Sequence, residues 1–119
     1  YHSLFPERAV ALKRHWYHIL LALAEGPTHG AEIRRRAARH TNGTLELYPA
    51  MLYGSLEDLL ERGWIEEVAE GTARPPDASE RSRYLALTPA GRETLAVSTA
   101  DHEQVVQIAK SLLAGEAPS

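Results

Sequence analysis

Glycine, next to proline, asparagine or arginine, interrupts roughly the first half of the chain three times, the last time at Gly63, and leaves only short segments between the breaks. In the first segment the apolar side chains recur at the spacing of an amphipathic helix; they are Trp16, Ile19, Leu20, Leu23 and Ala24. This helix should end at residues 25–27 (Glu-Gly-Pro), because glycine favours the left-handed cap and proline cannot continue a helix. The breaks therefore predict short helices rather than one long helix in this half.

The second segment begins at Thr28, whose hydroxyl is expected to cap a helix that carries Glu32 in its first turn. That helix should run to about His40 and stop at residues 41–43 (Thr-Asn-Gly), a strong helix breaker. Residues 44–47 (Thr-Leu-Glu-Leu) then alternate polar and apolar side chains, which predicts a very short strand.

A third helix is predicted to begin at Pro49, because the missing N–H of proline costs nothing in the first turn of a helix. Arg62 and Gly63 should close this helix. Its buried stripe is expected to comprise Leu52, Leu56, Leu59 and Leu60.

The second half of the chain predicts a hairpin followed by a long helix. Residues 64–68 and 83–87 are rich in aromatic and apolar side chains and read as two strands, with the polar residues 70–82 as the loop between them. Thr88 should cap a long helix over about residues 89–113, with proline at its first position. The apolar stripe of this helix is close to a heptad repeat; it comprises Leu95, His102, Val105, Val106, Ala109, Leu112 and Leu113.

This order of elements is the plan of a winged helix-turn-helix, an α+β fold that is mostly helical. The second and third helices form the helix-turn-helix, residues 64–87 form the wing, and residues 45–47 would add a third strand. In this motif the third helix enters the major groove of double-stranded DNA and the wing follows the adjacent backbone. We therefore expect a DNA-binding domain over residues 1–92, and a dimerisation helix over residues 93–119 whose apolar seam one short domain cannot cover alone.

Composition excludes several other classes of protein. The chain has 119 residues, enough for one domain, and no apolar run approaches the length of a membrane span. Cysteine is absent, which excludes thiol nucleophiles and thiolate metal sites. No secretory leader and no catalytic motif is recognisable, and the pair His15 and His18 has no further ligands to complete a metal site. We expect a cytoplasmic protein that is neither an enzyme nor membrane-bound and that needs no cofactor or metal.

Four sequence strings together resemble the PadR family of transcriptional regulators. They occur in order at residues 23–30 (LAEGPTHG), 49–53 (PAMLY), 59–65 (LLERGWI) and 84–92 (YLALTPAGR), and the resemblance covers about residues 16–95. The resemblance implies a dimeric repressor with a winged-helix DNA-binding domain and a C-terminal helix for dimerisation. A single terminal helix is similar to the short subfamily.

The candidate DNA-contacting residues lie on the second helix, the third helix and the wing: Thr28, His29, Arg34, Pro49, Met51, Tyr53, Arg74, Arg81 and Arg83. Tyr53 matches the Leu-Tyr pair of the family, which implies a hydroxyl contact to a phosphate; the alternative is a tyrosine packed between the second and third helices. The arginines at 34–36 and Arg39 form either a solvated face, which we favour, or a set of contacts to the DNA backbone.

Members of the family usually carry an aromatic residue at the position of Ala31, Ser or Thr at that of Met51, and a basic residue where Glu57 and Asp58 stand. Carboxylates here would repel phosphates, although Glu57 could instead accept a hydrogen bond from cytosine N4; we favour repulsion. These departures keep a second function open, that of a winged-helix protein-interaction module with weak or no DNA binding.

Effector-responsive members of the family imply one further ligand, a small flat aromatic molecule held between subunits. Trp16 offers a large stacking surface for such a molecule. The alternative is that the same residues are simply the core of the dimer. The candidate effector or dimer residues are Trp16, Leu95, His102, Val105, Val106, Ala109 and Leu112.

Overall fold

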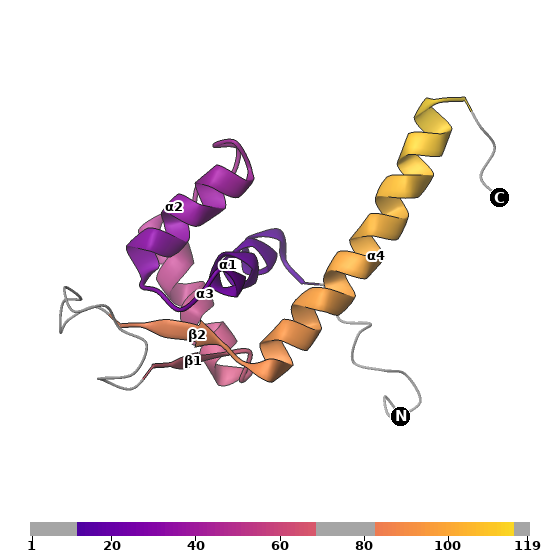
Figure 1. Ribbon diagram of the computed structural model, residues 1–119. Coiled ribbons are helices and arrows are strands. Elements are labelled where there is room, and N and C mark those ends of the chain that lie inside the picture. Colours follow the sequence, from indigo (N-terminus) through magenta and orange to yellow (C-terminus); the bar gives the residue numbers. More distant parts are fainter. Residues whose placement is uncertain (1–11, 69–82, 116–119) are drawn as a thin grey trace.

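The computed structural model describes residues 12–68 and 83–115. Figure 1 shows helices, a small sheet and a long final helix in the order α1, α2, α3, β1, β2, α4. Their bounds are Arg14–Ala24 (α1), Gly30–His40 (α2), Pro49–Glu61 (α3), Ile65–Glu67 (β1), Leu85–Leu87 (β2) and Pro89–Leu113 (α4). The expected winged helix-turn-helix, mostly helical with a small antiparallel sheet, is confirmed.

The helix ends lie where the local signals place them. Helix α1 gives way to Gly26 at a φ of 136°, and helix α3 gives way to Gly63 at a φ of 77°. Both are conformations that side chains with a Cβ rarely adopt. Pro49 stands in the first turn of α3, and the Thr88 hydroxyl oxygen accepts a hydrogen bond of 3.0 Å from the Gly91 N–H at the start of α4. These predictions are confirmed.

The predicted cap of the second helix is wrong by one residue. Thr28 is almost fully buried, and its backbone exchanges hydrogen bonds of 3.0 and 2.9 Å with that of Leu85. The cap of α2 is His29, whose Nδ1 accepts from the Glu32 N–H at 3.4 Å. Thr28 is drawn into the sheet, so the next residue takes the capping position.

The sheet consists of β1 and β2, which pair antiparallel with Ile65 opposite Leu87 and Glu67 opposite Leu85. The third strand predicted at residues 44–47 is wrong, because this segment pairs with neither β1 nor β2. Its side-chain alternation is real: Leu47 is 2% exposed and packs in the core. Thr28 instead pairs with Leu85 of β2 through an isolated antiparallel bridge.

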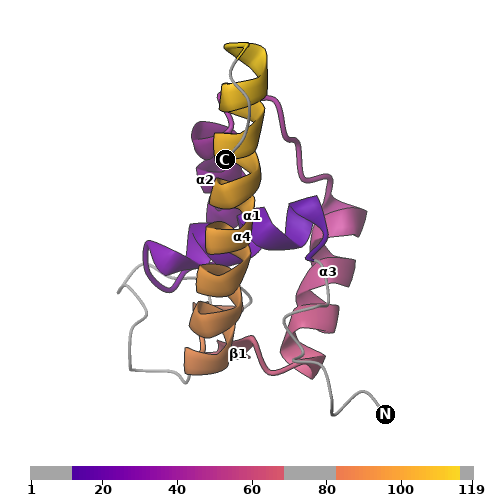
Figure 2. The same cartoon turned by 90° about the vertical axis from the view of Figure 1, so that its right-hand side faces the viewer.

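The hydrophobic core gathers around α1, which lies between α2 and α4 (Figures 1 and 2). Its members come from every described element: Trp16, Ile19, Leu20, Leu23, Ile33, Ala37, Leu47, Leu52, Leu56, Leu59, Ile65, Leu85 and Leu95 are all buried. The predicted stripe of α3 is confirmed at Leu52, Leu56 and Leu59, whereas Leu60 is only partly buried. One side of α3 therefore anchors the helix, and its other side is exposed.

Within the described residues, helix α4 contacts the body through its first half. Gly91 lies directly against the Trp64 carbonyl, and the Tyr17 hydroxyl is 2.7 Å from the Thr99 hydroxyl. Beyond Thr99 the helix extends away from α2 and the rest of the body (Figure 1). The helix is continuous across residues 92 and 93, where the sequence predicts a domain boundary, so that boundary stays a prediction.

Candidate nucleic-acid interface

The exposed side of α3 faces away from the core and lies between the start of α2 and the base of the hairpin. Pro49, Tyr53 and Glu57 are exposed on this helix. Tyr53 is 53% exposed, as expected for a residue off the leucine stripe. A side chain on this surface can therefore reach a ligand without disturbing the packing of α3.

The ring of Tyr53 also rests on the first turn of α2. A Cβ added to Gly30 would lie 3.1 Å from the Tyr53 hydroxyl oxygen and 3.3 Å from Cε1 of its ring. The two alternatives for Tyr53 thus describe different parts of one side chain: it packs between α2 and α3 and still exposes half of its surface. Its hydroxyl is held at the point where α2 begins.

Three neighbouring candidates differ in accessibility. Thr28 is 4% exposed, so its hydroxyl is not presented at the surface, and we remove it from the candidate interface. His29 is partly exposed, and its ring contacts that of Tyr84 edge-on at 5.7 Å between centroids. Met51 is half-buried against the core. Of these three, His29 and Met51 keep part of their surface exposed, whereas Thr28 does not.

Arg83 joins the base of the hairpin to α3. Its guanidinium donates to a Glu57 carboxylate oxygen at 2.6 Å and to one of Glu67 at 3.0 Å. The hydrogen bond to Glu57, followed by that to Glu67, raises the pKa of Arg83 above its usual value. The carboxylate of Glu57, expected from the sequence to repel phosphates, is thus paired with a cation. Arg74 and Arg81 lie outside the described residues.

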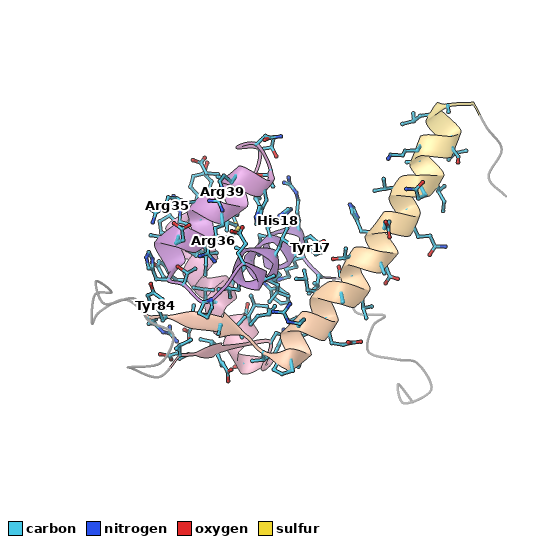
Figure 3. The ribbon with its side chains drawn as sticks, in the orientation of Figure 1. Tyr17, His18, Arg35, Arg36, Arg39 and Tyr84 are labelled. Carbon is cyan, nitrogen blue, oxygen red and sulfur yellow. The ribbon has the colours of Figure 1, made fainter. Side chains whose placement is uncertain are left out.

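The arginines of α2 are largely engaged within the chain (Figure 3). Arg36 is inserted between α2 and α1, where its guanidinium donates to the carbonyl oxygens of Ala22 at 3.0 Å and Gly26 at 2.8 Å. Arg35 pairs with Glu32 at 2.7 Å, and this hydrogen bond is the main cause that lowers the Glu32 pKa. Arg36 therefore satisfies carbonyls at the end of α1, a role that its position in a basic run did not indicate.

The end of this basic run pairs with one carboxylate of α1's C-terminal cap. Arg39 pairs with Glu25 at 3.1 Å, and His40 Nε2 lies 2.5 Å from the other oxygen of the same carboxylate. Arg34, in contrast, has no ion pair with any residue in the described part of the chain. Arg34 is consequently the arginine of α2 that stays available to an outside partner.

Trp16 does not lie at a subunit surface. It is 5% exposed, its ring meets that of Trp64 edge-on at 6.3 Å, and the Arg62 guanidinium lies 4.9 Å from its centroid. Leu95 is likewise buried, at 8% exposed. Both residues, which the sequence assigns to a dimer or effector surface, are thus covered within the single chain, because helical spacing gives the apolar face but not what covers it.

Most of the apolar residues in the second half of α4 are exposed in the single chain. Val105 is 60% exposed and Leu112 is 57% exposed, and the stripe also includes His102 and Ala109 on the surface and a half-buried Val106. Ile108, 44% exposed, belongs to the same face because it follows Val105 by three residues. Ile108 is missing from the stripe expected from the sequence, although this spacing would have found it.

Two other classes of site have no support in residues 12–68 and 83–115. No group of three metal-ligating side chains is brought together there, and His15 and His18 have no third partner of that kind. No helix in these ranges has the length and apolar character needed to cross a bilayer.

Comparison with known proteins places the chain among regulators. The model of the transcriptional regulator PadR-like family matches residues 19–97. An uncharacterized 37.1 kDa protein in transposon TN4556 of Streptomyces fradiae is 40% identical over 77 residues, which are 65% of this chain and 19% of that protein. The chain thus matches about a fifth of the length of that relative.

Solved structures share the fold. A transcriptional regulator from Clostridium thermocellum, Cth-833, has a TM-score of 0.64 and 22% identity, with 81% of this chain and 86% of that chain covered. A PadR-like transcription factor from Bacteroides fragilis has a TM-score of 0.62 and 21% identity, with 82% of this chain and 88% of that chain covered. The family match spans the helix-turn-helix, the hairpin and the first part of α4. The chain belongs to the PadR-like family of transcriptional regulators.

Proposed function

We propose that this protein is a cytoplasmic homodimeric repressor that binds a double-stranded DNA operator. Helix α3 enters the major groove with its exposed side, and the hairpin lies along the neighbouring backbone. The observation that carries the proposal is the division of α3, which buries its leucine stripe and exposes Tyr53 beside the start of α2. Tyr53, His29 and Arg34 contact phosphates in this arrangement, and Pro49 and Met51 lie nearby at the start of α3.

The distal half of α4 supports the proposed dimer. Val105, Ile108 and Leu112 are spaced i, i+3 and i+7, so they form one apolar face that the single chain leaves in water. A second copy of the chain covers this face, and the pair presents two recognition helices to the two half-sites of an operator. A small aromatic effector bound between the subunits would contact this face rather than Trp16.

Binding to DNA at two salt concentrations tests the proposal. The probe is a labelled duplex that spans the region upstream of the protein's own gene, with a random-sequence duplex for comparison. We expect tight binding to the upstream duplex that weakens steeply with salt, because neutralised phosphates release counterions. No binding to either duplex at low salt would instead favour a protein-interaction module, the alternative to which Glu57 and Asp58 point.

Arg83→Ala is expected to weaken binding to both duplexes by the same factor and to lower the salt slope by about one unit. The reason is that a phosphate contact positions the protein without reading the sequence. Arg83 also pairs with Glu57 and Glu67, so the variant leaves two carboxylates without this cation. Adding Glu57→Gln and Glu67→Gln should recover part of the lost affinity. A change in which duplex is preferred, at an unchanged slope, would contradict this role.

A further inference from the structure

Gly54 is a helical glycine for which the described residues show no internal need. It is exposed in the middle of α3, and a Cβ added to it would meet nothing within 4 Å. A glycine in an exposed helix interior destabilises the helix relative to alanine, because it loses more backbone freedom on folding. The chain therefore carries a destabilising residue at a position where alanine would fit.

The other glycines of the described residues each have a reason inside the molecule. Four have a positive φ, and the remaining two contact neighbouring side chains or backbone; they are Gly26, Gly43, Gly63 and Gly115, and Gly30 and Gly91. Gly54 has neither feature. Nothing in residues 12–68 and 83–115 therefore accounts for its small size, and close approach of the backbone to a ligand is a recognised use of glycine.

The surroundings of Gly54 favour DNA as that ligand. Tyr53, its neighbour, is half exposed and held at the start of α2. Glu57, one turn later on α3, is paired with Arg83 from the base of the wing. A phosphate-rich ligand that approaches Gly54 therefore meets a phenol on one side and a carboxylate paired with an arginine on the other.

We propose that Gly54 is the point of closest approach between α3 and the DNA, and that the absence of a side chain there sets how deeply the helix enters the groove. This inference rests on the proposed function and adds to it a residue that determines affinity by its size. A methyl group added at this position would hold the helix away from the base edges and weaken the contacts that the neighbouring side chains of α3 make with DNA.

Gly54→Ala is the direct test, because it should change stability and binding in opposite directions. We expect the Tm to rise by about 2–5 °C, from the better helix propensity of alanine. Affinity for the duplex upstream of the protein's own gene should fall about ten-fold, as for an overpacked contact. Gly54→Gln, with a helix propensity close to that of alanine but a longer side chain, should weaken binding further.

A matched control separates stability from binding. Ala96→Gly makes the reverse change at an exposed position of α4, so it should lower the Tm and leave DNA affinity unchanged. The double variant should return the Tm to that of the original protein without restoring affinity. Unchanged binding by Gly54→Ala would overturn the proposal, as would a fall in its Tm, which would reveal an internal need for glycine. If the unmodified protein binds no DNA while the Tm rises as expected, the proposed function fails, and the role of Gly54 at a DNA surface fails with it.

Discussion

Gly91→Ala is expected to lower the free energy of unfolding by about 3 kcal/mol or more, a large loss for the addition of one methyl group. The added Cβ would overlap the Trp64 carbonyl oxygen and lie 2.8 Å from the carbonyl carbon. That carbonyl accepts a hydrogen bond of 3.1 Å from the Thr88 N–H, so moving it also disturbs the start of α4. A loss of this size is a large part of the stability of a small domain. Urea denaturation followed by circular dichroism measures it.

Gly54→Ala serves as the control, because the chemical change is the same and both glycines are helical. At Gly54 the new methyl meets open space and should stabilise the fold, whereas at Gly91 it meets backbone that holds two elements together. A denaturation midpoint for Gly91→Ala equal to that of the original protein would show that α4 and Trp64 are less closely packed than the structure has them.

Val105→Glu together with Ile108→Glu is expected to convert the proposed dimer into a monomer and to reduce operator affinity by about 10²–10⁴-fold. Both side chains are exposed in the single chain, so the charges would be buried only when two copies meet. The second half-site contact, which is intramolecular in a dimer, is then lost. Light scattering gives the mass in solution, and the labelled upstream duplex gives the affinity.

Gln107→Glu is the matched control, since this exposed residue adds a charge to α4 between the two positions but on another face of the helix. It should leave both the mass and the affinity unchanged. Neither α4 variant should unfold the single chain, because none of these side chains belongs to its core. An unmodified protein that is already a monomer at micromolar concentration would rule out the proposed dimer.

The features that the sequence predicted well are those set by neighbouring residues. Pro49, Gly63 and Thr88 each impose a backbone conformation or a capping bond on their own segment, so the helix boundaries follow from them. The outward position of Tyr53 likewise follows from its place relative to the leucines of the same helix. No knowledge of the rest of the fold is needed for these inferences.

The features that the sequence did not predict depend on partners far away in the chain. Residues 44–47 alternate as a strand does, yet β2 pairs with Thr28, which the sequence assigned to a helix cap. Arg83 and Glu57 are 26 residues apart, so their pairing could not be read from spacing. Trp16 has the helical spacing that either a domain core or a subunit interface would show, and packing against Trp64 decides between them.

The bridge between Thr28 and Leu85 has a mechanical consequence. Thr28 comes just before the cap of α2, and its backbone is hydrogen-bonded to β2, which is itself paired with β1. The helix-turn-helix and the base of the hairpin are therefore joined by one continuous set of backbone hydrogen bonds. We expect each half of the dimer to meet DNA as a rigid unit, because internal adjustment would break these bonds. Fitting to operators with different separations between half-sites then depends on α4 alone. The length of this helix would act as a ruler that selects the spacing and leaves the choice of bases to α3.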